Sequence, residues 1–145
     1  MTAQSSNAIL EVLANEYFKD SADVFKLILM DSGFVYDRDN HDTYADVSAS
    51  ELATGNGYTA GGIELTGISV TRDDAEDLVK IRWNTVSIVT SGGDIGPSPG
   101  YIIFNDTDPS DTIVGYVKFG TTEQTQLEGG TAQITNPGVN LKKAA

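Results

Sequence analysis

Fifteen glycines divide this chain into short runs that are rich in valine, isoleucine, threonine and aromatic residues. Short runs of this composition, bounded by Gly, Asp and Pro, are typical of β-strands joined by turns. We count about eight such runs, with one helical segment before them. The sequence therefore predicts an all-β fold, a β-sandwich that is jelly-roll-like or a small barrel, with one N-terminal helix and long loops.

The length of 145 residues fits one domain, and a hydrophobic content of 39% suffices for one core. The chain shows no internal repeat and no linker that would divide it. We therefore expect a single β domain, with an N-terminal helix in residues 1–20, a β-sandwich in residues 21–141 and a tail in residues 142–145.

The formal net charge is −12, from 9 basic and 21 acidic residues. A surface of this charge repels nucleic acid and anionic membranes, so we expect neither as a partner. No cysteine is present and His41 is the only histidine, which leaves no thiol nucleophile and little material for histidine-based catalysis. These counts argue against most enzymes, and we expect no cofactor.

The N-terminus lacks the basic start of a signal peptide, and no apolar run is long enough to span a bilayer.

Two segments near the start have clear patterns. After Ser6, which can cap a helix, Ile9, Leu10, Leu13 and Tyr17 recur at helical spacing, so we expect a helix to about Phe18 with this face on the body. Residues 24–30, VFKLILM, are apolar on both faces except at Lys26. This pattern predicts a central strand buried on two sides, between its sheet and that helix.

The later strands alternate in the manner of half-buried sheets. Val79, Ile81 and Trp83 share one face, which predicts a core position for Trp83, with an interface anchor as the alternative. Lys80 and Arg82 form the opposite, basic face, which we expect to meet an acidic neighbour. Before them the alternation changes phase at Gly67, which predicts a β-bulge that bends the chain between sheets.

Two connections are too long for hairpins. Residues 31–59 mix acids, aromatics and glycines, and loops longer than about 12–15 residues are usually functional, ordered by a partner or disordered. Within this loop, Ser48 and Glu51 have capping-box spacing, which indicates a turn of helix around Glu51 and Leu52. Residues 91–100, SGGDIGPSPG, combine glycines with Pro97 and Pro99, as suits a docking loop.

Three groups of residues suggest site chemistry, and each has a simpler explanation. The first two are acidic loops, comprising Asp37, Asp39, His41 and Asp42, and then Asp106, Asp108 and Asp111. The first lacks the glycine and the final glutamate of a calcium loop, and the second is explained by turn formation. The glycines of residues 55–62 do not complete a dinucleotide fingerprint and precede a strand, so we expect them to serve the backbone. We therefore predict no metal site and no catalytic residues.

The candidate partner-binding residues lie in the two loops and on the basic strand face. They are Tyr36, Tyr44, Tyr58, Lys80, Arg82, Pro97 and Pro99. The three tyrosines have no periodicity that would place them in a core, and tyrosine is favoured at protein contacts.

Several stretches of the sequence are similar to small, mostly uncharacterised virion structural proteins of tailed bacteriophages. The similarity is strongest in Asp37–Leu52, Gly55–Gly62 (GNGYTAGG) and Gly93–Pro99 (GDIGPSP), and covers about residues 24–120. The resemblance implies a non-enzymatic structural component and supplies no catalytic residues.

Together these observations predict a capsid decoration or cement protein on the virion surface, made in the host cytoplasm. Such a protein binds the major capsid protein lattice and bridges capsid subunits, and self-association as a dimer or trimer is consistent with lattice symmetry. The alternative is a tail-associated or receptor-binding module that recognises the host surface. A hydrolase acting on the cell envelope through Asp106, Asp108 and Asp111 is a third, less favoured interpretation.

Overall fold

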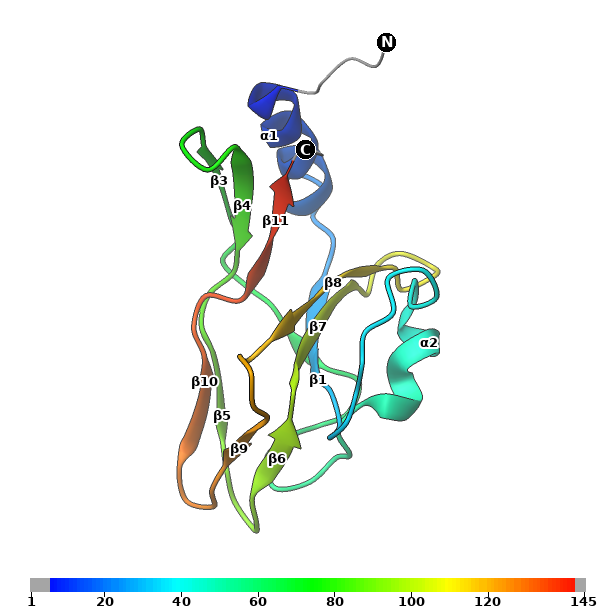
Figure 1. Cartoon of the computed structure of the whole chain (residues 1–145), viewed down its shortest axis with the longest axis vertical. Helices are drawn as coiled ribbons and strands as arrows, with labels where there is room; N and C mark the ends of the chain where they lie inside the picture. The colour runs from blue at the N-terminus through cyan, green and yellow to red at the C-terminus, as the bar shows by residue number, and fades with distance from the viewer. Residues whose placement is uncertain (1–5, 143–145) are drawn as a thin grey trace.

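The structure is a computed structural model that describes residues 6–142 (Figure 1). Within this range it contains eleven strands and two short α-helices, which confirms the all-β class. The prediction of about eight strands was too low, because the strands at residues 95–98 and 124–126 were not predicted and the segment around Gly67, expected as one bulged strand, is two strands. The expected tail lies outside the described residues except for Lys142.

The helices are α1 (Asn7–Ala14) and α2 (Tyr44–Val47). The strands are β1 (Phe25–Leu29), β2 (Ile63–Glu64), β3 (Ser69–Asp73), β4 (Leu78–Arg82), β5 (Val86–Val89), β6 (Ile95–Ser98), β7 (Gly100–Asn105), β8 (Ile113–Lys118), β9 (Gln124–Gln126), β10 (Thr131–Ile134) and β11 (Gly138–Lys142).

All strand pairs are antiparallel, and the strands form four sheets with the orders β2-β1-β7-β8, β11-β4-β3, β10-β5 and β6-β9. Several strands that follow one another in the chain lie end to end but belong to different sheets. Because β6 leads into β7 and β9 follows β8, the β6-β9 pair prolongs the β7-β8 pair, and β5-β10 prolongs β4-β11 in the same way (Figure 1). The chain thus builds two long ribbons, while a two-sheet sandwich stays a prediction.

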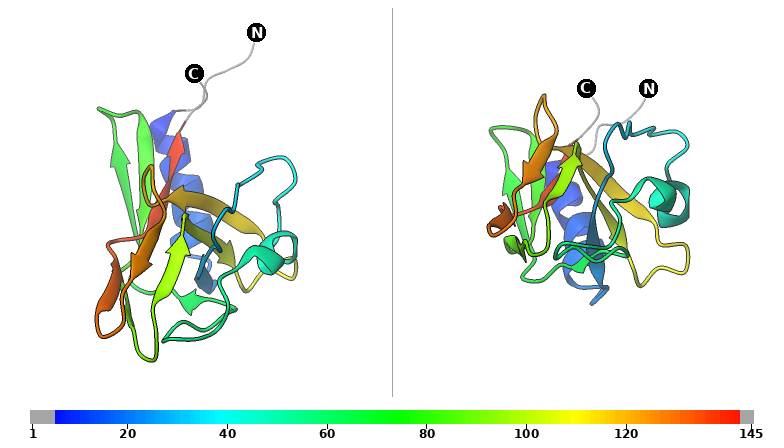
Figure 2. Two further views of the ribbon diagram at one scale, coloured as in Figure 1. Left: turned by 60° about the horizontal axis from the view of Figure 1, so that its bottom comes forward. Right: turned by 90° about the horizontal axis from the view of Figure 1, so that it is seen from below.

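Strand β1 lies between β2 and β7 and is buried on both faces, as the sequence predicts. Leu27 and Leu29 point into the main core, whereas Ile28 and Met30 point into a second cluster on the other side of the sheet. The second face is covered by the loop that carries α2, and not by the N-terminal helix. Seen from below, α2 lies on one side of the molecule and β3 to β5 lie on the other (Figure 2).

The main core contains a group of aromatic rings where the N-terminal helix meets the strands. The ring of Trp83 lies 5.4 Å from that of Phe25 and 6.0 Å from that of Phe18, measured between centroids. Only 3% of Trp83 is exposed, so its predicted core position is confirmed. Aromatic pairs at such distances stabilise a core beyond the area that they bury.

The N-terminal helix begins where the sequence predicts but turns a different face to the body. The Ser6 side chain accepts a hydrogen bond from Ile9 N–H at 3.3 Å, and a π-helical turn at Asn15–Lys19 follows α1. The buried face consists of Leu10, Ala14 and Phe18. Of the four residues of the predicted face, Leu10 packs on the core, whereas Ile9, Leu13 and Tyr17 are exposed. The helix is apolar on two sides, and packing of Phe18 against Trp83 fixes its rotation.

The predicted change of sheet near Gly67 is confirmed, but the predicted bulge is wrong. Strand β2 ends at Glu64 in one sheet and β3 begins at Ser69 in another, so Gly67 lies between strands. Its φ of +67° is in the left-handed region that favours glycine. The Asn84 side chain occupies the space that a Cβ atom would need.

We predict that Leu27→Ala lowers the free energy of unfolding by about 2–5 kcal/mol, because Leu27 is fully buried and the change leaves a cavity. Urea unfolding of the isolated protein measures this. Val89→Ala is the control: Val89 is 68% exposed on β5, and we expect a change of about 0.5 kcal/mol or less. A loss below about 1 kcal/mol for Leu27→Ala would contradict the placement of β1 at the centre of the core.

Candidate partner-binding surface

The long loop between β1 and β2 is held on the sheet by one buried carboxylate, that of Glu51. Its Oε1 accepts hydrogen bonds from the Tyr58 hydroxyl at 2.6 Å and from Gly61 N–H at 2.8 Å. Its Oε2 accepts one from the Tyr44 hydroxyl at 2.6 Å. A buried carboxylate needs such donors, because an unpaired charge in the interior is costly. Glu51 therefore joins the two parts of the loop on either side of it, at Tyr44 and at residues 58–61.

The Tyr58 hydroxyl links this carboxylate to the central strand. It accepts a hydrogen bond from Leu29 N–H at 3.0 Å while donating its own proton to Glu51. Burial, and then the hydrogen bond to Glu51, raise the pKa of Tyr58 and raise the pKa of Tyr44 to about 12. Both hydroxyls therefore stay protonated, and keep donating to Glu51, to a higher pH than an ordinary tyrosine would.

These contacts correct the prediction for Tyr58. Its side chain is only 1% exposed, so it is a core residue and is not accessible to a partner. Tyr44 is half-buried, and its ring stacks on Phe104 at a centroid distance of 4.9 Å. In the sequence both tyrosines have polar neighbours, which suggested exposed positions. The sequence did not indicate that Glu51 is buried and accepts hydrogen bonds from both hydroxyls.

Tyr36 lies in a second aromatic group nearer the surface. Its ring is 5.7 Å from that of His41 and 5.5 Å from that of Tyr116, and Phe34 stacks on His41 at 5.5 Å. Tyr36 is half-buried, while Val35 beside it is 80% exposed. Tyr36 thus remains a candidate contact residue, although part of its ring is already covered.

The helical turn of this loop lies before the predicted position. Helix α2 begins after Thr43, and the Asp46 carboxylate reaches back to accept hydrogen bonds from Asp42 N–H at 3.1 Å and Thr43 N–H at 2.9 Å. Glu51 has extended backbone angles. The expected helix around Glu51 and Leu52 was therefore wrong, because the acid that caps the helix is Asp46 and Glu51 serves the interior.

The two basic residues of β4 are engaged within their own sheet. Lys80 Nζ lies 2.9 Å from Asp73 Oδ2. Arg82 donates to the carbonyl of Ile81 at 2.8 Å, to that of Val139 at 3.0 Å and to Asn140 Oδ1 at 2.8 Å. Binding an acidic neighbour would compete with these contacts, so the structure lends little support to the predicted basic strip.

The two prolines of the second long connection have different surroundings. Pro97 is exposed, whereas Pro99 is buried. Strand β6 occupies Ile95–Ser98 and pairs with β9, so this part of the connection is not the free docking loop that the sequence suggested. Only Pro97 remains accessible as a contact residue.

An exposed surface that the sequence analysis missed lies on the side of the N-terminal helix that faces away from the strands. We call it the outer helix face, formed by Ile9, Val12, Leu13 and, at its edge, Tyr17, which are 44%, 48%, 50% and 40% exposed. Tyr17 also reaches the strands, since its ring lies 5.9 Å from that of Phe25 and its hydroxyl accepts a hydrogen bond from Asn105 Nδ2 at 3.3 Å. These four are the majority of the large exposed apolar side chains in residues 6–142. The sequence contained the signal, since three of these residues composed the face that it assigned to the core.

Carboxylates of the acidic loops accept hydrogen bonds from nearby backbone N–H groups and so stabilise turns. Asp108 Oδ1 accepts a hydrogen bond from Ser110 N–H at 3.1 Å, and Asp73 Oδ1 accepts two from the backbone N–H groups of Ala75 and Glu76. Among residues 6–142, no group of three or more His, Asp or Glu side chains is placed to hold a metal ion. Over the same range no helix has the length and apolar character needed to cross a membrane.

Comparisons with known proteins give no further assignment. No model of a protein family, no curated protein and no solved structure matches the chain.

We predict that Tyr58→Phe destabilises the protein by about 1–3 kcal/mol, because it leaves Leu29 N–H without an acceptor and removes one donor from Glu51. Thermal and urea unfolding measure the loss. Tyr36→Phe is the matched control: its hydroxyl reaches only the His41 carbonyl at 3.5 Å, so the expected cost is about 0.5 kcal/mol or less. Equal losses for both variants would refute the role given to Glu51.

We also predict an acid-dependent contribution from Asp46. Hydrogen bonds, first from Thr43 N–H, then from the Thr43 hydroxyl and Asp42 N–H, hold the pKa of Asp46 below its usual range. A lowered folded-state pKa adds stability above the unfolded value of about 3.9, and this is lost as the pH falls through the folded value.

The stability difference between the wild type and Asp46→Asn should therefore be largest near neutral pH and should shrink below about pH 4. Urea unfolding across this pH range measures it. In Asp39→Asn, the control, we expect a nearly constant difference, because the Asp39 carboxylate accepts no hydrogen bond within residues 6–142. A pH-independent difference for Asp46→Asn would contradict the capping role.

Proposed function

We propose that this protein is a non-enzymatic structural component of a bacteriophage virion, a capsid decoration or cement protein that binds the outer shell and bridges capsid subunits. The observation that carries the proposal is the outer helix face. Large apolar side chains gathered on one exposed face mark a site of protein contact, whereas isolated ones need no explanation. The resemblance of residues 24–120 to phage virion proteins supports the choice of partner.

The outer helix face is presented on a firm support. Helix α1 packs on β3, β4 and β11, and Ala14 and Phe18 on its opposite side are buried. The side chain of Asn7 adds a hydrogen bond to Asp74 in the turn after β3, at 3.1 Å. A face held in this way loses little conformational freedom on binding, which favours affinity.

The charge of the chain is consistent with this arrangement. Acids in the turns at residues 37–46, 73–77 and 106–111 are mostly exposed, while the outer helix face is mainly apolar. On a shell, these acids would face solvent and the apolar side chains would be covered. A protein that binds only the assembled lattice stabilises the lattice by its binding free energy.

The tail-associated alternative has lost part of its basis. Tyrosines and acids displayed on loops suit recognition of a host surface, but Tyr58 and much of Tyr44 are turned inward. Copy number separates the two: hundreds of copies per particle indicate a shell protein, and a few dozen or fewer indicate the tail.

We predict that the double change Val12→Ser and Leu13→Ser weakens attachment to particles at least tenfold, because it removes apolar area from the outer helix face. Co-sedimentation with particles that lack the protein measures attachment, and thermal rupture of the particles measures stabilisation. Val89→Ser, on β5 and more exposed at 68%, is the control. Full attachment of the double variant would remove the helix from the interface, and unchanged rupture temperature with wild-type protein would remove the cement function.

A further inference from the structure

The two strand ribbons leave an open seam, which we define as the gap between the edge formed by β8 and β9 and the edge formed by β10 and β11. Strands β9 and β10 follow one another through a short turn, yet each pairs with a different strand, β6 or β5. Within the described residues, no backbone hydrogen bond joins β8 or β9 to β10 or β11. The Cα atoms of β9 and β10 lie mostly more than 8 Å apart.

Two hollows occupy this seam. The first, of about 230 Å³, lies between β9 and β10, and the second, of about 440 Å³, lies between β8 and β11. Gly115 and Val139 both line the second hollow, where the Val139 side chain packs over Gly115. Strands β8 and β11 approach within 8 Å, so the wider part of the seam, between β9 and β10, is the part that leaves room for an additional strand. Neighbouring strands lie about 4.8 Å apart, so a strand inserted there needs about 9.6 Å between the two edges.

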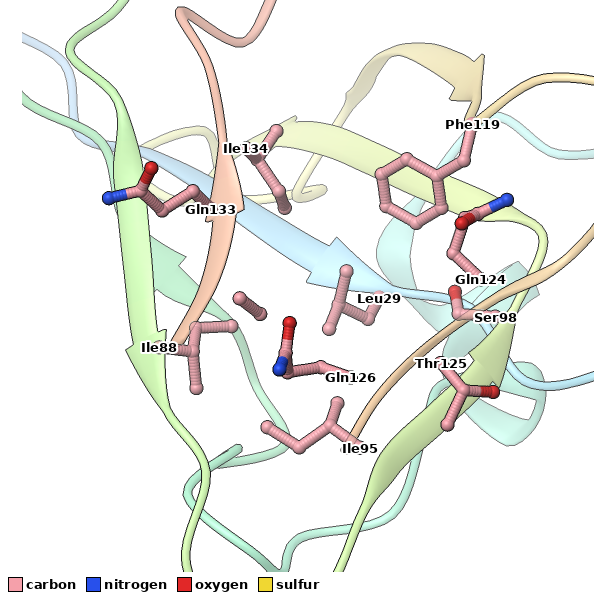
Figure 3. Close-up of a pocket in the computed structure, with 11 residues that line it drawn as sticks. Leu29, Ile88, Ile95, Ser98, Phe119, Gln124, Thr125, Gln126, Gln133 and Ile134 are labelled. Carbon is pink, nitrogen blue, oxygen red and sulfur yellow. The ribbon is translucent and has the colours of Figure 1, made fainter. Parts of the chain in front are cut away.

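The lining of the first hollow indicates what enters it (Figure 3). Its floor is apolar and consists of Leu29, Ile88 and Ile95, with Phe119 and Ile134 at the sides. Its polar residues are neutral, and include Gln124, Gln126 and Gln133. No charged residue lines it, although the chain carries a net charge of −12. The hollow therefore fits an apolar side chain on an uncharged segment.

Backbone groups on both sides of the seam specify an extended occupant. The Gly130 carbonyl accepts a hydrogen bond from Thr90 N–H at 2.9 Å and so faces β5. Because backbone groups alternate sides along a strand, the N–H and C=O of Gln133 face the seam. By the same reasoning Phe119, whose N–H donates to the Pro99 carbonyl at 3.0 Å, places the backbone groups of Lys118 in the seam from the other edge.

We propose that the seam binds an extended, uncharged segment of another protein, which adds as a β-strand and seats an apolar side chain on Leu29, Ile88 and Ile95. Strand addition to open edges is an established mode of peptide recognition, in which the backbone gives affinity and pockets for alternate side chains give specificity. A helix satisfies its own backbone groups and would leave these edges unpaired. The inference rests on the proposed function only in naming a capsid subunit as the source of the segment.

The test uses the isolated full-length protein and a displayed library of random twelve-residue peptides. Selected peptides should be uncharged and should alternate apolar with polar residues. A synthetic copy of the best one should bind Ala132→Phe at least tenfold more weakly than the wild type, because Ala132 lines the hollow and the larger ring fills it. Thr131→Phe, one residue earlier and exposed, is the matched control and should bind within about twofold of the wild type.

Amide hydrogen exchange gives a second readout that does not depend on the substituted side chains. In the wild type, the Gln133 amide should exchange rapidly when free and become protected on peptide binding, while the amides of β4 stay protected throughout. Thermal unfolding shows whether Ala132→Phe is folded. If that variant does not fold, protection of the Gln133 amide in the wild type decides the question.

Three results would overturn the inference: peptides without alternation, equal binding to Ala132→Phe and Thr131→Phe, or a seam filled by a second copy of this chain. Co-sedimentation with particles separates this proposal from the proposed function. If the peptide results are as expected but the wild type does not attach to particles, the seam is supported as a binding site for an extended segment, and the proposed capsid function is refuted. If the wild type attaches and Ala132→Phe attaches equally well, the seam does not contact the shell and the capsid subunit is excluded as its occupant.

Discussion

The two-sided burial of β1 is the constraint on which the rest of this structure depends. A strand with apolar side chains on both faces needs cover on both, and in this chain the second sheet and the N-terminal helix supply only one cover. The other must come from the segment that follows β1. The loop of residues 31–62 is therefore part of the core, and its length reflects the area of sheet that it covers.

The buried Glu51 carboxylate holds the covering loop of residues 31–62 in one particular path over the sheet. Apolar contacts of Val47 and Phe34 hold the loop to the sheet without fixing its path, whereas the hydrogen bonds of Glu51 require particular positions for Tyr44, Tyr58 and Gly61. A buried charge that loses its donors is strongly unfavourable, so alternative paths of the loop are penalised. The carboxylate thus selects one path of the loop in addition to stabilising the fold.

With much of the long loop committed to the core, the two surfaces that we propose for partners are the outer helix face and the seam. They differ in chemistry: one is a convex apolar stripe, and the other is a neutral slot between strand edges. A protein that bridges neighbouring subunits needs two such separate surfaces. The exposed acids in the turns between them oppose nonspecific association of a chain with these apolar sites.

The sequence by itself determined the all-β class, the start of the N-terminal helix, the two-sided burial of β1, the core position of Trp83 and the use of acids in turns. Each of these follows from local patterns of side-chain polarity and backbone preference. Only the tertiary structure decided which face of the helix is buried, that Tyr58 and Glu51 lie inside, and that β9 and β10 do not pair with each other. Local patterns cannot settle these points because each depends on the packed fold. Phe18 contacts Trp83, far along the chain, Glu51 is buried with the Tyr58 hydroxyl, which also accepts from Leu29 N–H of β1, and the seam exists because β9 pairs with β6 while β10 pairs with β5.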